Sequence, residues 1–167
     1  MRDETDELLD AWQRERPDLD VAPLAVLSRV TRLARHLDRE RRAAFAEHGL
    51  EAYEFDVLTA LRRAGPPYEL TPGQLVHETL VGSGTMTNRL DRLEARGLID
   101  RRPDPEDGRA RRIRLTGQGR DRADAAIAAL LERERRLLGG LSVQNRNTLA
   151  ALLRGVLAHF EGDLIDA

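Results

Sequence analysis

The chain has 167 residues, the size of one globular domain, and 34% of them are charged. Its 27 basic residues, all arginine, nearly balance 29 acidic residues and leave a net charge of −2. The chain contains neither cysteine nor lysine, which excludes disulfides, thiolate catalysis, cysteine-ligated zinc, Schiff-base chemistry and a P-loop lysine.

Hydrophobic periodicity predicts helices over residues 3–16, 24–47 and 51–64. Trp12, the only tryptophan, lies on the first of them. Proline or glycine follows each segment closely, which is where helices commonly stop. The first part of the chain is therefore expected to be helical throughout.

A helix-turn-helix followed by a hairpin is predicted in the middle of the chain. Thr71 and the proline after it resemble an N-cap and a first helical residue, and a second helix over about 84–96 follows a turn that contains glycine. Two short segments, 98–102 and 112–115, flank the turn-rich stretch 103–108 and predict a two-stranded hairpin.

Two further helices, over residues 117–138 and 142–160, complete a fold that is mainly α with a small two-stranded β wing. The last helix carries a broad apolar stripe that suits a helix of a partner chain, and packing within the same chain is the alternative. The stripe consists of Leu149, Leu152, Leu153, Val156, Leu157 and Phe160.

Charge is distributed unevenly along the chain. Residues 85–120 hold ten arginines against six acidic residues, a pattern typical of nucleic-acid binding, although a solvated helix surface can show it too. The first ten residues are acidic and lack an apolar signal core, and the longest uncharged run, Thr79 to Asn88, is too short to span a membrane. We therefore expect a soluble cytoplasmic protein with no membrane partner.

The second helix of the helix-turn-helix has two chemically different faces. Met86, Leu90 and Leu93 share the face that we expect to be buried. The opposite face and its flanks carry short or basic side chains that fit the major groove of DNA, where asparagine can pair with adenine and arginine with guanine. The candidate DNA-binding residues of this helix are Ser83, Thr85, Thr87, Asn88 and Arg92.

The hairpin supplies three more candidate DNA-binding residues, Asp107, Arg109 and Arg111. A loop arginine beside a groove-bound helix can enter the minor groove, and Asp107 would hold Arg109 through a charge-assisted hydrogen bond. The alternatives are an ordinary surface helix and a solvated turn with an exposed ion pair. The two elements in succession favour double-stranded DNA as a partner.

Three segments of the chain resemble the winged helix-turn-helix of the MarR transcriptional regulators. They run from Ser83 to Arg102 (SGTMTNRLDRLEARGLIDRR), from Asp104 to Arg109 (DPEDGR) and from Ile113 to Gly119 (IRLTGQG). The number and order of the flanking predicted helices are also similar to that family, so the resemblance extends over the whole chain.

The resemblance implies one domain over residues 1–167. Within it, residues 1–64 and 117–167 would form a helical dimerisation region, and residues 65–116 the DNA-binding lobe. The resemblance also implies a homodimer on a palindromic operator, because two DNA-binding lobes related by two-fold symmetry fit an inverted repeat.

Trp12, Asp56 and Arg89 resemble the effector triad of the urate-responsive branch of this family, which includes relatives that respond to aconitate or plant phenolics. The resemblance implies that Arg89 pairs with an anion, Trp12 covers it and Asp56 accepts a hydrogen bond. Ala64 stands where that branch often has a polar residue, so the resemblance does not single out urate. The structural alternative makes Trp12 a packing anchor and joins Asp56 and Arg89 in an ion pair.

The sequence predicts no enzyme, no metal site and no cofactor. The four histidines lack metal-ligand spacing, and no nucleophile motif such as G-x-S-x-G is present. His36 and the run Arg39 to Arg42 can add positive charge for an anion, although a solvated face is the ordinary explanation.

The expected function is that of a sequence-specific transcriptional regulator, a repressor that a small anion releases from DNA. The alternative is an architectural DNA-binding protein that needs no ligand and shows no preference among sequences at matched salt.

Overall fold

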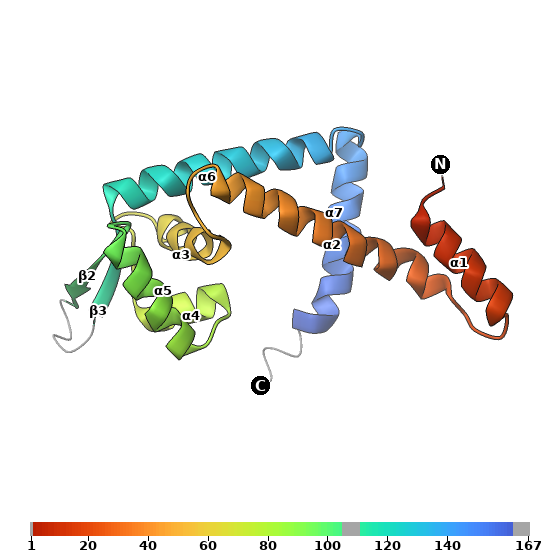
Figure 1. The fold of residues 1–167 in the computed structure, drawn as a ribbon, viewed down its shortest axis with the longest axis horizontal. Coiled ribbons are helices and arrows are strands. Elements are labelled where there is room, and N and C mark those ends of the chain that lie inside the picture. The colour runs from red at the N-terminus through yellow and green to blue at the C-terminus, as the bar shows by residue number, and fades with distance from the viewer. Residues whose placement is uncertain (1, 105–110, 162–167) are drawn as a thin grey trace.

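A computed structural model describes residues 2–104 and 111–161, and helices dominate it (Figure 1). The helices are α1 (Glu4–Glu15), α2 (Ala22–Ala46), α3 (Ala52–Arg63), α4 (Pro72–Thr79), α5 (Ser83–Ala95), α6 (Gly117–Leu137) and α7 (Val143–Glu161). The strands are β1 (Glu69–Leu70), β2 (Ile99–Pro103) and β3 (Arg111–Leu115). The mainly α fold and the winged helix-turn-helix expected from the sequence are confirmed, and the helix bounds agree to within about two residues.

Short polar side chains fix where several helices begin. Asp3 caps α1, Thr71 caps α4, where its hydroxyl accepts from the Gln74 amide at 3.2 Å, and Thr116 caps α6. Each cap satisfies an amide that the helix itself leaves unpaired. Pro72 follows its cap at the first position of α4, as the sequence indicated.

The sheet has three strands instead of the two expected. All pairs are antiparallel in the order β1-β3-β2, and Leu70 of β1 lies opposite Ile113 of β3. The amide of Leu115 also donates to the carbonyl of Tyr68 at 3.0 Å. β1 has only two residues and directly precedes a helix cap, so it shows no alternation that sequence patterning could detect.

One hydrophobic cluster connects the end of α2 with α3, α4, α5, the strands and α6. The rings of Phe45 and Phe55 stack with centroids 3.9 Å apart and join α2 to α3. At the start of α6 the backbone passes so close to β2 that a Cβ built on Gly119 would lie 2.0 Å from the carbonyl oxygen of Leu98. The helix-turn-helix therefore packs on α3 and the strands, and α3 in turn packs on both long helices, α2 and α6.

α2 and α6 lie along each other and are joined by Arg133, which bonds Glu40 at 2.8 Å and also Glu47. α1 packs on the N-terminal part of α2, at the end of the molecule opposite α5 and the strands (Figure 1). α7 turns away from the end of α6 and makes at most isolated contacts with the other described elements. Its apolar stripe is left uncovered, which excludes the alternative that this stripe is packed within the described chain.

Candidate DNA-binding surface and effector site

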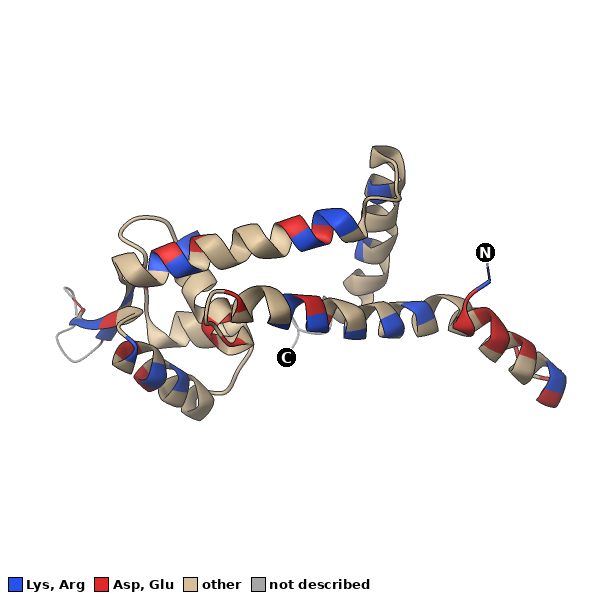
Figure 2. Cartoon of the chain, turned by 45° about the horizontal axis from the view of Figure 1, so that its top comes forward, with Lys and Arg blue, Asp and Glu red and all other residues tan. Residues whose placement is uncertain are grey.

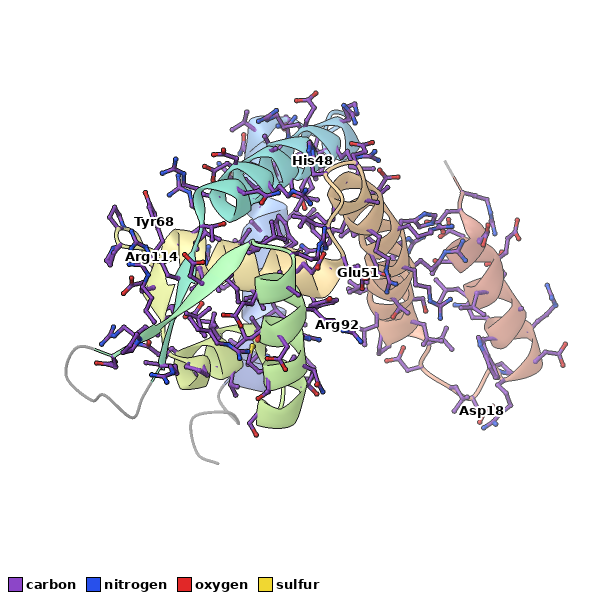
Figure 3. The ribbon with its side chains drawn as sticks, turned by 60° about the vertical axis from the view of Figure 1, so that its left-hand side comes forward. Asp18, His48, Glu51, Tyr68, Arg92 and Arg114 are labelled. Carbon is purple, nitrogen blue, oxygen red and sulfur yellow. The ribbon has the colours of Figure 1, made fainter. Side chains whose placement is uncertain are left out.

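The two faces of α5 are divided as the sequence predicted. Met86, Leu90 and Leu93 are buried against the core, while the five candidate DNA-binding residues of this helix are all exposed. Figure 3 shows Arg92 on the side of α5 that is turned away from the strands. Asn88 and Arg92 make no side-chain hydrogen bond or ion pair with other described residues, so both are available to an outside partner.

The start of α5 is open to solvent. Its N-cap is Gly82, and none of the described side chains caps it. Leu80, in the turn before it, has φ +53° and is 85% exposed, so the turn does not cover the first amides of α5. Uncapped amides at a helix start suit a phosphate group, and the hydroxyls of Ser83 and Thr85 lie beside them.

The wing candidates are only partly placed. Arg111 is exposed on β3, opposite Pro103 of β2. Asp107 and Arg109 fall within residues 105–110, outside the described residues. At the loop end of the two strands, Arg112 Nε donates to Oδ2 of the buried Asp104 at 2.8 Å, a pair that sequence reasoning did not identify.

Sequence reasoning also missed an ion pair that joins the wing to α5. Arg101 of β2 pairs with Asp91, and its Nε lies 3.5 Å from a carboxylate oxygen of Glu94. Both acidic residues project from the exposed side of α5, where they would repel phosphates. Arg101 compensates part of that negative charge and ties β2 to α5.

An open hollow of about 490 Å³ lies where α2, α3 and α5 meet. It contains both Asp56 and Arg89, two of the three predicted effector residues. Its lining residues are Arg42, Ala46, Leu50, Glu51, Ala52, Tyr53, Asp56 and Arg89. Figure 3 shows Glu51 at the start of α3, beside the end of α5 that leads into β2. We call this space the α3–α5 hollow.

Asp56 and Arg89 share the α3–α5 hollow without bonding each other. The guanidinium of Arg89 lies over the ring of Tyr53, 5.3 Å from its centroid, while Asp56 pairs with Arg41 at 3.8 Å. Burial raises the pKa of Asp56, and the positive charges of Arg41, Arg89 and Arg63 partly oppose that rise. The predicted alternative of an Asp56–Arg89 ion pair is therefore wrong, because each side chain has another partner.

Trp12 does not reach this hollow within its own chain. It is 43% exposed on α1, which is tied to α2 by Arg29, whose guanidinium bonds Asp3 at 2.9 Å and Asp6 at 2.7 Å. From Arg29 to Arg42, α2 extends over about 20 Å at 1.5 Å per residue. Figure 2 shows the acidic residues of α1 and the arginines of α2 that dominate this end of the molecule.

Sequence reasoning did not identify Tyr53 as part of the site and treated Arg42 only as one of a run of arginines. The signal for Tyr53 was weak, because an aromatic residue on a helix usually belongs to the core. No helix in the described part of the chain is long and apolar enough to cross a membrane. The described residues also bring together no group of three histidine or carboxylate side chains that could hold a metal ion.

The chain is similar to known proteins in both sequence and fold. A family model described as "MarR family" matches residues 48–110. The transcriptional regulator PecS of Dickeya dadantii is 37% identical over 156 residues, which are 93% of this chain and 94% of that protein.

Two solved structures are similar over most of this chain. A mutant of Escherichia coli MarR in complex with operator DNA has a TM-score of 0.68 and 27% identity, with 83% of this chain and 99% of that chain covered. Bordetella bronchiseptica BpsR, described as regulated in its DNA binding by 6-hydroxynicotinic acid, has a TM-score of 0.60 and 28% identity, with 76% and 91% covered. Together with the match to PecS over nearly its whole length, these findings show that the chain belongs to the MarR family of DNA-binding transcriptional regulators.

Proposed function

We propose that this protein is a homodimeric repressor that binds a palindromic operator and leaves it when a small anion binds in the α3–α5 hollow. The observation that carries the proposal is that one helix, α5, exposes candidate DNA-binding side chains on one side and lines the hollow with another side chain. Asn88 and Arg92 project from its exposed side, while Arg89 points into the hollow. An anion that moves Arg89 therefore moves the DNA-binding side chains with it, and the coupling is reciprocal by linkage.

DNA contact through α5 and the wing is supported by the exposed polar face of α5, its uncapped start and the position of Arg111 on β3. The proposed DNA-binding residues are Ser83, Thr85, Thr87, Asn88, Arg92, Asp107, Arg109 and Arg111. The complex of the similar E. coli MarR mutant with operator DNA supports the same use of the fold here.

The homodimer is supported by the apolar surface that the single chain leaves exposed. On α7, Leu152 and Phe160 are each 66% exposed, and on α2, Val26 is 58% exposed. Apolar side chains exposed in a stripe along a helix are typical of an interface. The segments 1–64 and 117–167 would form the dimerisation region, with 65–116 as the DNA-binding lobe. Packing of α7 against a second copy would also supply the contacts that a 19-residue helix otherwise lacks.

The anionic effector is supported by the chemistry of the hollow. Arg42 and Arg89 offer positive charge, Tyr53 offers an aromatic face, and Asp56 offers a hydrogen-bond acceptor. Urate, aconitate and phenolic acids share the required negative charge, and the similar BpsR is described as regulated by 6-hydroxynicotinic acid. Because α1 lies far along α2, Trp12 would cover the hollow only from the second copy of the dimer.

Fluorescence anisotropy with an operator duplex tests this proposal. The duplex is chosen by selection from a randomised DNA pool, and a shuffled duplex at the same salt is the control. We expect urate, aconitate or salicylate to weaken specific binding by about tenfold, which corresponds to about 1.4 kcal/mol of coupling. Arg89→Ala and Asp56→Asn should reduce that response with little change in melting temperature. Arg120→Ala removes an exposed charge outside the hollow and is the matched control.

Two results would contradict the effector site. One is an unchanged response in Arg89→Ala, and the other is a loss of response that parallels an equal loss of melting temperature. Equal affinity for the selected and shuffled duplexes would instead favour the architectural DNA-binding protein.

A further inference from the structure

The C-terminal end of α5 is joined to α3 by an ion pair whose carboxylate is buried and whose guanidinium is partly exposed. The guanidinium of Arg96, the residue that caps α5, donates through Nη1 to both carboxylate oxygens of Glu54. Its Nη2 also donates to the carbonyl oxygen of Gly49 at 2.6 Å, in the loop between α2 and α3. Arg96 therefore connects the helix that carries the DNA-binding face with the junction of two dimerisation helices.

Burial makes this contact hard to break. The side chain of Glu54 is 1% exposed, which makes it the most buried carboxylate in any ion pair of the described residues. Its Oε2 also accepts from the Glu51 amide at 2.9 Å and so helps to cap α3. A buried carboxylate without its cation is strongly unfavourable, so the position of Arg96 is closely determined.

The N-terminal half of α5 is held by the buried side chains of Met86 and Leu90 and by weaker polar contacts than the C-terminal end. Arg89 lies seven residues before Arg96, about two helical turns and 10 Å away on the same face. Its contact with α3 is the cation–π contact with Tyr53, the residue that precedes Glu54. The N-terminus of α5 is capped by no described side chain and follows an exposed turn.

We propose that Glu54 and Arg96 are positioning residues that fix the C-terminal end of α5 and thereby set the angle at which its N-terminal half meets DNA. In this arrangement α5 turns about the Glu54–Arg96 pair, and displacement of Arg89 from Tyr53 by an anion changes the angle. The inference rests on the proposed function and adds to it the place about which α5 turns, the Glu54–Arg96 pair. Direct contact of Glu54 or Arg96 with bases is not required.

The predicted effect is on specificity, because a helix at the wrong angle loses base contacts but keeps its charge near the phosphates. The variants are Glu54→Gln, Arg96→Met and the double variant. Glu54→Gln keeps an oxygen that can accept from the Glu51 amide. Arg96→Met alone leaves the buried Glu54 carboxylate without its cation, and the double variant avoids this if the single variant fails to fold. Arg133→Met is the matched control, because Arg133 also bonds two groups on another helix but does not contact α5.

Affinities for the selected and shuffled duplexes are measured over a range of salt, with helix content and dimer state checked for each variant. We expect the ratio of specific to non-specific affinity to fall by about tenfold in Glu54→Gln and in the double variant, roughly the effect of one mismatched base pair. The salt dependence should stay unchanged, because no phosphate contact is lost. Arg133→Met should lower the melting temperature and keep the ratio.

Four outcomes would overturn the inference. If Arg96 merely contacts a phosphate, Arg96→Met will weaken both duplexes equally and reduce the salt slope by about one, while Glu54→Gln will not lower the ratio. If the pair is merely structural, Arg133→Met will lower the ratio as much as Glu54→Gln at a similar loss of melting temperature. A wild-type ratio near one would overturn the proposed function and this inference together, whereas a high wild-type ratio that Glu54→Gln preserves overturns only the inference.

Discussion

Arg89 and Arg96 lie on one face of α5, two turns apart, and contact consecutive residues of α3, Tyr53 and Glu54. One contact is an ion pair with a buried carboxylate, and the other is a cation–π contact at the edge of a hollow. In the proposed mechanism the Glu54–Arg96 pair fixes the C-terminal end of α5, and an anion displaces the weaker Arg89–Tyr53 contact midway along the helix. This difference provides a physical route from a small molecule to a DNA-binding surface.

Loss of Arg92 should weaken specific DNA binding and leave the fold intact. Arg92→Ala removes an exposed guanidinium that makes no hydrogen bond or ion pair with other described residues, so the melting temperature should change little. If Arg92 contacts a guanine, specific affinity should fall by about 1–3 kcal/mol. Anisotropy with selected and shuffled duplexes measures the loss. Arg63→Ala, an exposed arginine on α3, is the control, and an equal effect of both substitutions would contradict the role of Arg92.

A side chain at Gly119 should destabilise the whole protein. In Gly119→Ala the new methyl group would meet the Leu98 carbonyl at 2.0 Å, so β2 and α6 must separate. We expect a loss of at least about 1–3 kcal/mol in the free energy of unfolding, measured by urea denaturation. Gly117→Ala is the matched control, because a Cβ there meets nothing within 4 Å. A variant Gly119→Ala as stable as Gly117→Ala would show that this close approach is absent in solution.

A charge within the stripe of α7 should dissociate the dimer. Leu152 is 66% exposed in the single chain, and Leu152→Asp would bury a carboxylate in an apolar interface. Sedimentation velocity should show monomer, and operator affinity should fall because one DNA-binding lobe remains. Arg154→Asp introduces the same carboxylate off the stripe and should leave the dimer intact. If Leu152→Asp remains a dimer at micromolar concentration, the stripe of α7 is not part of the dimer interface.

Acid should loosen α1 from α2. The pKa of Asp3 lies below 3.8 mainly because its carboxylate accepts a hydrogen bond from Arg29. The pKa of Asp6 is also lowered, chiefly by a hydrogen bond from the Asp3 amide and next by one from Arg29. Because these two carboxyl pKa values are lower in the folded protein, the ionised carboxylates stabilise the docking of α1 at a pH above 3.8, the pKa of the unfolded chain. This stabilisation is lost as the pH falls through the lowered pKa of the folded protein.

Trp12 reports this docking because it is the only tryptophan and lies on α1. Acrylamide quenching of its fluorescence should rise below pH 3.8 in the wild type, while Arg29→Ala should show the higher quenching already at pH 7. Arg35→Ala, also on α2, should behave like the wild type. Identical pH profiles for wild type and Arg29→Ala would exclude these ion pairs as the cause.

Local signals made most of the fold predictable. Thr71, Pro72 and the spacing of Met86, Leu90 and Leu93 identify the helix-turn-helix because caps and apolar periodicity act within a few residues. The short strand β1 was missed because its pairing partner lies more than 40 residues away along the chain. Patterning within a window cannot detect such a pair.

The candidate site was less predictable, because its contacts join distant segments. Glu54 and Arg96 are 42 residues apart. One available signal was an acidic residue on the apolar face of α3, since Glu54 shares that face with Leu58 and Leu61. The distance of Trp12 from the hollow follows from the length of α2 and the position of α1, neither of which is a local property.

Selection of DNA from a randomised duplex pool tests the central claim most directly. The purified protein is mixed with the pool at fixed moderate salt, bound duplexes are recovered, and the enriched sequences are compared. A two-fold symmetric regulator should enrich an inverted repeat whose half-sites lie about 10 base pairs apart, centre to centre. A bound pool that remains random after repeated rounds would contradict the regulator and favour binding through charge alone.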